Sequence, residues 1–139
     1  NRGGELMRLW HQDLLDKLPR QQLLGQHREC CALRGKGWGK SHSTVNYVFK
    51  HDMERLVAYH ILVMQEMQSR GYNPNTKWAD YNYRGKKLQN DDKIDCLLVR
   101  KYLKLGSNIY PEHNIDYLQE CIDNLAGKGV TCQFIEGVA

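Results

Sequence analysis

The chain has 139 residues, which is enough to bury one continuous core without cross-links or a structural metal, and nothing in it calls for a second domain. Hydrophobic residues make up 41% of the chain and charged residues 26%, and no apolar run approaches the roughly 20 residues that a membrane span needs. These values exclude a membrane-spanning or disordered protein, while the net charge of +4 would help binding to a polyanion without requiring it.

The cysteines favour reduced thiols in a cytoplasmic protein. There are five, an odd number, and no N-terminal apolar segment suggests secretion. Cys30 and Cys31 are adjacent and cannot easily bridge one another, and Cys96, Cys121 and Cys132 stand alone. A zinc site needs paired ligands at short spacing, so we expect structural thiols and no metal.

The first six residues, NRGGEL, show no periodicity and are followed by Met7-Arg8-Leu9-Trp10, which has the form of a natural start. We therefore expect residues 1–6 to be a leader and residues 7–139 to form a single domain.

A first helix is predicted from Leu18 to Arg34, with Pro19 at its start and glycines at 35, 37 and 39 after its end. Arg28 and Glu29 should lie near the edge of its apolar face. That face carries leucine, histidine and cysteine side chains at three- and four-residue spacings: Leu23, Leu24, His27, Cys30 and Cys31.

The loop that follows, RGKGWGKSH at residues 34–42, is basic and rich in glycine. Its Gly39-Lys40-Ser41 end resembles a P-loop, but that motif needs a preceding strand and a glycine where this chain has Arg34, so we reject nucleotide binding. Two interpretations remain open. The loop could approach a phosphate backbone closely while Trp38 stacks on bases, or it could be a solvated turn with Trp38 packed on the core.

A long helix is predicted from Asp52 to Arg70, with Gly71 after its end and with His60 as a satisfied interior histidine on its apolar stripe. Residues 76–88 then interleave Trp78, Tyr81 and Tyr83 with lysines and arginine, a composition that unstacked bases exploit. A loop packed by its own aromatic rings has the same composition, and we favour this second interpretation.

Two more helices complete the expected fold. The first would be capped by Asp91 or Asp92, would end at Gly106, and would contain Ile94, Leu97, Leu98, Tyr102 and Leu105. The second would open at Pro111, would end at Gly127 before a short extended segment at 130–135, and would contain Ile115, Leu118, Ile122 and Leu125. The pattern predicts an all-α single domain of about four helices with long basic and aromatic loops.

Motifs for catalysis are few. The chain has no serine or cysteine nucleophile motif, no HExxH and no carboxylate pair with metal-ligand spacing. This narrows the search toward chemistry that uses an amine and one acid.

Met7-Arg8-Leu9 together with residues 18–29, LPRQQLLGQHRE, resembles the N-terminal helix of the pyrimidine-dimer DNA glycosylases. The family pattern Leu-x-x-Gln-x-Leu-x-x-x-x-Arg-Glu is met in register, and residues 69–72, 83–85 and 109–111 resemble later family segments. The resemblance implies a compact all-α domain, in agreement with the predicted helices.

The resemblance also implies a mechanism. The Met7 α-amine would be the nucleophile, since an α-amine with a pKa of about 7.7 to 8.0 is substantially neutral near physiological pH. Glu29 would be the acid/base and charge-stabilising group, and no cofactor is needed. We expect a monomeric enzyme, cytoplasmic in a bacterial or phage-like setting, whose partner is double-stranded DNA carrying a lesion and not a membrane. The expected DNA-binding residues are Arg8, Gln21, His27, Arg28, Arg34, Lys36, Trp38, Lys40, Arg84 and Lys86.

Three features differ from the family. Arg8 is bulky, so Met7 would be retained as the first residue, and Ala32 stands where an arginine is expected, so Arg34 or the basic loop would supply that charge. The last eight residues lack the aromatic segment associated with dimer recognition. The alternatives to an enzyme are a non-catalytic DNA- or RNA-binding module on the same fold and a small helical interaction protein with solvated basic loops.

Overall fold

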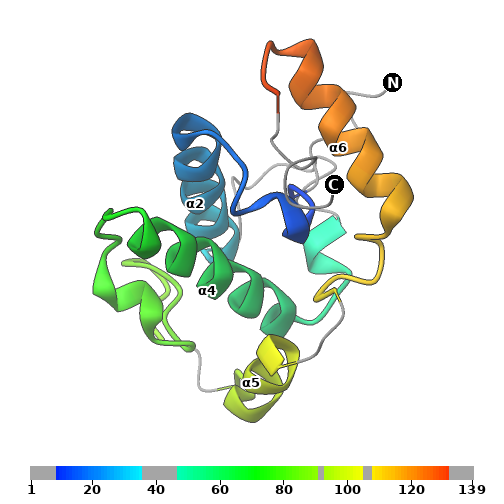
Figure 1. Cartoon of the computed structure of the whole chain (residues 1–139). Helices are drawn as coiled ribbons and strands as arrows, with labels where there is room; N and C mark the ends of the chain where they lie inside the picture. Colours follow the sequence, from blue (N-terminus) through cyan, green and yellow to red (C-terminus); the bar gives the residue numbers. More distant parts are fainter. Residues whose placement is uncertain (1–8, 36–46, 91–92, 105–107, 132–139) are drawn as a thin grey trace.

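The computed structural model describes residues 9–35, 47–90, 93–104 and 108–131. This part of the chain is helical, with α2 (Arg20–Arg34), α4 (Met53–Ser69), α5 (Cys96–Lys104) and α6 (Ile115–Gly127) joined by loops and by the 3₁₀ turns η1 (Gln12–Leu14) and η2 (Thr76–Ala79) (Figure 1). Within the described ranges no strand forms, and the one bridge pairs Tyr83 with Asn90. The prediction of an all-α domain is confirmed.

No helix in the described ranges combines the length and the apolar character that crossing a bilayer would take.

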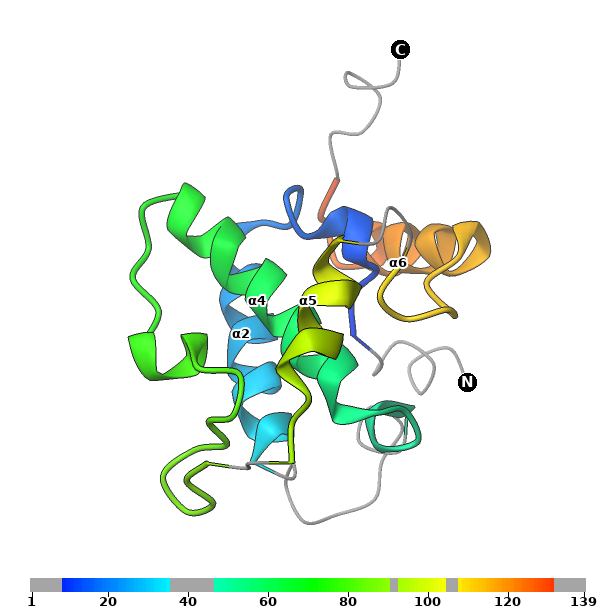
Figure 2. The ribbon, with the colours of Figure 1, turned by 90° about the horizontal axis from the view of Figure 1, so that it is seen from below.

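Helix α2 follows the predicted pattern closely. It begins at Arg20, after Pro19 as the N-cap, where the missing N–H of proline costs no helical hydrogen bond, and it ends at Arg34 with Gly35 as the C-cap. Leu23, Cys30 and Leu33 are fully buried along one side of the helix. This side packs against α4, and the two helices lie side by side in both views of the ribbon (Figures 1 and 2).

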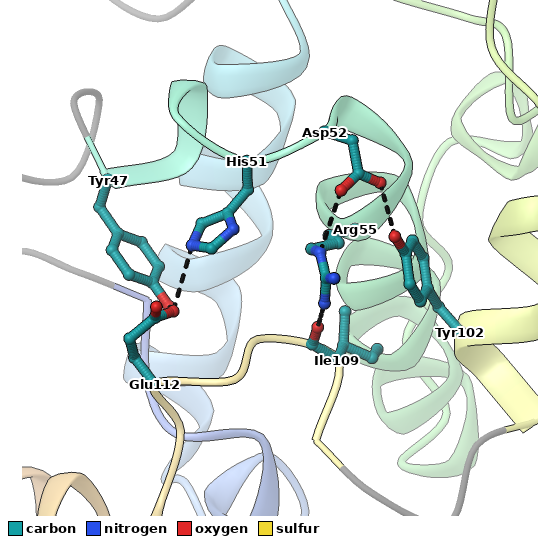
Figure 3. Close-up of polar contacts among 7 residues, drawn as sticks. All are labelled: Tyr47, His51, Asp52, Arg55, Tyr102, Ile109 and Glu112. Atoms are coloured by element: carbon teal, nitrogen blue, oxygen red, sulfur yellow. Dashed lines mark hydrogen bonds and ion pairs between the residues drawn. The ribbon is translucent and has the colours of Figure 1, made fainter.

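Helix α4 runs through the middle of the molecule, between α2 and α5. Asp52 is its N-cap and Gly71, at φ +89°, follows its C-cap, as the sequence predicted. The Asp52 carboxylate does not cap a backbone N–H. It instead accepts hydrogen bonds from Arg55 Nε at 3.0 Å and from the Tyr102 hydroxyl at 2.9 Å (Figure 3).

The predictions for α5 and α6 need correction at their starts. Asp95 caps α5, since its Oδ1 accepts from the amides of Leu97 and Leu98, while Asp91 and Asp92 lie outside the described residues. Helix α6 begins four residues after Pro111, where the Asn114 side chain accepts from the Tyr117 amide at 2.9 Å.

The apolar residues expected in these two helices are not all buried. Leu97 and Ile115 are 74% and 75% exposed, whereas Tyr102 and Leu125 lie in the core as expected. Val99 on α5 and Tyr117 and Cys121 on α6, which the sequence did not single out, are also buried. The expected extended segment at 130–135 falls mostly outside the described residues.

The last third of the chain holds the first described residues in place. The Tyr117 hydroxyl donates to the Leu9 carbonyl at 2.6 Å, and Ile109 N donates to Gln12 Oε1 at 2.8 Å. Leu9 is fully buried, and Figure 2 shows the segment that follows it lying beside α6. The beginning of the domain is thus fixed by contacts that span about a hundred residues of sequence.

A second set of contacts joins the linker between α5 and α6 to the start of α4 (Figure 3). Glu112 accepts from the Tyr47 hydroxyl at 2.9 Å and from His51 Nε2 at 3.1 Å, while the Arg55 guanidinium bonds the Ile109 carbonyl. Burial acts to raise the pKa of Glu112, but the bonds from Tyr47 and His51 outweigh it and lower the pKa.

Candidate active site

Glu29 lies on α2 at the edge of the buried face, partly shielded from solvent. Its Oε1 accepts a hydrogen bond of 2.7 Å from Gln26 Nε2, one helical turn earlier. Burial raises the pKa of the Glu29 carboxyl to about 7, and the Gln26 bond offsets only part of that effect. Near neutral pH this carboxyl therefore exists in both protonation states, which suits a group that must take and return protons.

Gln26 connects Glu29 to the beginning of the domain. Its side chain is 2% exposed, and its Oε1 accepts from the Trp10 backbone N–H at 2.8 Å. Because a backbone N–H can only donate, the amide must present its oxygen to Trp10 and its NH₂ to Glu29. The orientation of Gln26 is thus set by its surroundings.

Tyr59 on α4 completes this network. Its hydroxyl is fully buried, donates to the Trp10 carbonyl at 2.5 Å and lies 3.1 Å from Gln26 Oε1. Burial raises its pKa well above the ordinary value, so it remains a neutral donor. Sequence reasoning missed both Gln26 and Tyr59. The position of Gln26, three residues before Glu29, was a usable signal, whereas the contact of Tyr59 depends on how α4 packs.

Apart from Arg34 and His27, which are described below, the other residues expected at the site fall into three groups. Gln21 and Arg28 are exposed on the outer side of α2, two turns apart. Arg84 and Lys86 lie on a separate loop. A third group lies outside the described residues: Met7, Arg8, Lys36, Trp38 and Lys40.

Arg34 was expected to bind DNA, and the structure places it in the interior. Its side chain is 1% exposed, and its guanidinium donates to the carbonyls of Trp78, Asp80 and Tyr83 at 2.8 to 2.9 Å. It also stacks over the Trp78 ring, with Cζ 5.0 Å from the ring centroid. A guanidinium engaged in this way has no face to offer a phosphate, so we do not retain Arg34 among the DNA contacts.

His27 points inward toward α4 and away from the outer side of α2. Its Nδ1 lies 2.9 Å from His60 Nε2, and with Cys31 the two histidines form a group whose possible ligand atoms are within 4.8 Å of one another. His60 is fully buried, as the sequence predicted for an interior histidine.

The donor set of this group does not suit a metal ion. Arg34 Nη1, which can only donate, lies 3.0 Å from His60 Nδ1, so Nδ1 accepts and the proton of neutral His60 is on Nε2. That proton points at His27 Nδ1, where a metal would have to sit. Burial and the Arg34 charge also lower the pKa of His60, and a cation would meet the same charge. We interpret the trio as a hydrogen-bonded chain that links α2 to α4.

The aromatic side chains of the 76–88 region pack on one another. Trp78 and Tyr83 meet edge to face with centroids 4.7 Å apart, and Trp78 also contacts Arg34 and His60. The favoured interpretation, a loop packed by its own aromatic rings, is confirmed for these residues. Arg84 joins this loop to the end of α2, because its Nε donates to the Arg34 carbonyl at 2.7 Å.

Comparison with known protein families identifies the family of this chain. The model of the pyrimidine dimer DNA glycosylase family matches residues 7–80, just over half of the chain. The chain belongs to this family. It is therefore a DNA repair glycosylase, and DNA is its substrate. The matched segment contains Glu29, Gln26, Trp10 and Tyr59, and it begins at Met7. The searches of curated proteins and of solved structures returned no match.

Proposed function

We propose that this family member releases pyrimidine-dimer bases from ultraviolet-damaged DNA and then cleaves the strand at the resulting abasic site. The Met7 α-amine, in a chain that starts at Met7, would be the nucleophile, and Glu29 would be the acid and base. The observation that carries the proposal is the hydrogen-bonded path from Trp10 through Gln26 to Glu29.

The path supports a site shared between the chain start and α2. Met7 precedes Trp10 by three residues, and because consecutive Cα atoms are 3.8 Å apart, its Cα cannot lie more than roughly 11 Å from that of Trp10. A Met7 amine at the first position would therefore stay close to Trp10, the residue that Gln26 links to Glu29. Proximity of this kind is what converts a bimolecular attack into an intramolecular one.

The chemistry balances with these two groups alone. The neutral amine forms a bond to the sugar C1′ as the bond from C1′ to the base breaks, and the base leaves with the electron pair and is protonated. Loss of a proton from the new ammonium and opening of the sugar ring give an imine between enzyme and deoxyribose. The Glu29 carboxylate then takes a proton from C2′, the electrons move into the new C2′–C3′ double bond, and the 3′ phosphate leaves with its electron pair.

The environment of Glu29 suits this sequence of steps. With a pKa near 7, its carboxyl can protonate a leaving oxygen and, once ionised, accept the C2′ proton. Arg28 and Gln21 are exposed on the adjoining outer side of α2, which supports a role for them in binding the flanking phosphates, and Arg8 would add a further contact.

Borohydride trapping tests the role of the amine. Protein that begins at Met7 should form a covalent adduct with DNA that carries an abasic site or a dimer, and protein with residues 1–6 still attached should not. Equal trapping by both proteins would rule out Met7 as the sole nucleophile.

A second experiment tests Glu29. Glu29→Gln should bind damaged DNA with unchanged affinity and lose strand cleavage by a factor of roughly 10² or more. Glu66→Gln, a change on α4, serves as the control and should cleave normally. If Glu29→Gln cleaves like the parent protein, Glu29 is not the acid/base, and if no variant cleaves any lesion, the chain is a binding module on this fold.

A further inference from the structure

A groove of about 400 Å³ lies between the last turn of α2 and the loop at residues 84–88. Cys31, Ala32 and Gly35 line it on the α2 side, and Trp78 also contributes to its lining. The whole loop lies beyond residue 80, where the match to the glycosylase family ends. The groove is thus built partly from a segment to which the family match assigns no role.

The loop that lines the groove is held in one conformation by its own hydrogen bonds. Tyr83 and Asn90 form an antiparallel bridge, Arg84 N donates to Gln89 O at 2.7 Å, and Gln89 N donates to Gly85 O at 2.8 Å. Gly85 has φ +101°, a conformation that favours glycine. These contacts close a tight turn and present Lys86 and Lys87 at its tip.

The turn is also fixed to α2. Arg84 Nε donates to the carbonyl of Arg34, and the Arg34 guanidinium reaches back to the carbonyls of Trp78, Asp80 and Tyr83. The two sides of the groove therefore form one unit. A site of this kind binds without a large ordering cost, since few groups need to be immobilised on binding.

The charge of the groove is positive. Arg84, Lys86 and Lys87 line it, both lysines are exposed, and no aspartate or glutamate is found among the described residues of the lining. Buried Arg34 keeps its charge nearby, since burial lowers its pKa only to about 10. One face of Trp78 is already covered by Arg34, so the groove suits a sugar–phosphate backbone better than a stacked base.

The groove also lies in line with Glu29. Ala32 follows Glu29 by three residues, so that it lies on the same side of α2 and about 4.5 Å further along the helix axis. A strand whose reacting sugar is at Glu29 and which runs toward the C-terminal end of α2 would reach the groove within a turn of the helix.

We propose that this groove binds the DNA backbone next to the nucleotide that reacts at Glu29, and that Lys86 and Lys87 bind its phosphates. The proposal rests on the proposed function, since it takes Glu29 as the reacting end of the same strand. It adds a second contact surface, separate from Arg28 and the chain start.

The salt dependence of DNA binding tests this proposal. In the double variant Lys86→Ala/Lys87→Ala of the full domain, the slope of log Kd against log salt concentration should fall by about 1 to 2 relative to the parent protein, because each phosphate contact contributes about 0.9. The affinity at low salt should fall by roughly tenfold or more. Single-turnover cleavage at subsaturating DNA should fall with the fraction of DNA that is bound, because both lysines contact the strand that reacts.

Matched variants separate the possible outcomes. Lys101→Ala/Lys104→Ala removes two exposed lysines from α5 and should leave the slope unchanged, whereas Lys86→Arg/Lys87→Arg keeps the charge and should keep the slope. Equal slopes in the Lys86/Lys87 and Lys101/Lys104 alanine variants would overturn the proposal. If the slope falls only in the Lys86/Lys87 variant while no protein cleaves DNA, the groove stands and the glycosylase mechanism fails.

Discussion

Glu29 should lower the stability of the protein above neutral pH. Its pKa is about 7 in the folded protein against 4.5 in the unfolded chain, so the folded state binds the proton more tightly. Its contribution to stability is therefore fully present below pH 4.5 and is lost as the pH rises through 7. Glu29→Gln removes this dependence, and its free energy of unfolding should rise relative to the parent by up to about 3 kcal/mol between pH 4.5 and 8.

Urea denaturation at several pH values measures this difference, and Glu112→Gln is a control of opposite sign. The pKa of Glu112 is lowered on folding, so that its contribution is present above pH 4.5 and is lost as the pH falls. Glu112→Gln should therefore be less stable than the parent protein at neutral pH, and this difference should shrink at acid pH. A Glu29→Gln difference that does not change with pH would show that Glu29 is solvated in the folded protein.

Gln26 should set the pKa of Glu29 and the position of the chain start together. Gln26→Leu removes the donor to the carboxylate, so the pKa of Glu29 should rise and the limb of the pH–rate profile that belongs to Glu29 should move to higher pH. It also leaves the Trp10 amide without its acceptor, at a cost of about 1 to 3 kcal/mol in stability.

The pH–rate profile of strand cleavage, measured at a temperature where both proteins are folded, checks this prediction. Tyr59→Phe is the control, because it disturbs Trp10 and leaves the bond between Gln26 and Glu29 in place. A lower rate with an unmoved profile in Gln26→Leu would mean that Gln26 supports the fold and does not tune Glu29.

At the scale of elements, Arg34 is the residue on which the contact between α2 and the 76–85 segment depends. Arg34→Met keeps much of the side-chain volume but leaves the partly buried carbonyls of Trp78, Asp80 and Tyr83 without their donor. The variant should lose about 2 to 3 kcal/mol of stability, because several partly buried acceptors lose a charged donor together. Urea denaturation measures this loss, and Arg28→Met, an exposed change on the same helix, should alter stability by less than about 0.5 kcal/mol.

The helices that the sequence predicted well are those with one continuous apolar face and with recognisable flanking residues at both ends. Asp52 and Gly71 flank α4, and Pro19 and Gly35 flank α2, so the helix ends were predicted correctly although neither Asp52 nor Pro19 caps its helix through a side chain. For α5 and α6 the apolar residues are numerous enough to permit more than one buried face. Packing against the chain start buries Tyr117 and leaves Ile115 exposed, a choice for which the sequence holds no local signal, whereas Tyr102 is one of the residues that the sequence did single out on α5.

The burial of Arg34 is another feature that tertiary packing decides and that the local sequence does not predict. An arginine beside a glycine-rich basic loop has the sequence pattern of a DNA contact, but the carbonyls that bind it come from residues 44 to 49 positions later. Glu29 was identified because its helix resembles a known family, and no local pattern singled it out. The network around it depends on Trp10 and Tyr59, which only the folded chain brings to Gln26.

At the scale of the whole molecule, the segment outside the family match supports the segment inside it. Residues 109–125 contribute Ile109, Tyr110, Tyr117, Cys121 and Leu125 to the core, and the Tyr117 hydroxyl holds the Leu9 carbonyl. Because Leu9 precedes Trp10 directly, a contact from α6 positions the residues next to Gln26 and Glu29. Loss of the Tyr117–Leu9 hydrogen bond should therefore change the position of the residues that contact Gln26 and reduce activity at Glu29.

Tyr117→Phe tests this coupling. It removes the bond to the Leu9 carbonyl and should cost about 1 to 2 kcal/mol in stability, raise hydrogen exchange at the Trp10 amide and reduce the yield of borohydride-trapped adduct. Tyr102→Phe removes a comparable hydroxyl bond, to Asp52, far from the chain start in sequence and on α5. It should lose similar stability without affecting Trp10 exchange or trapping. If the two variants change exchange at Trp10 equally, α6 stabilises the domain as a whole and does not position the chain start.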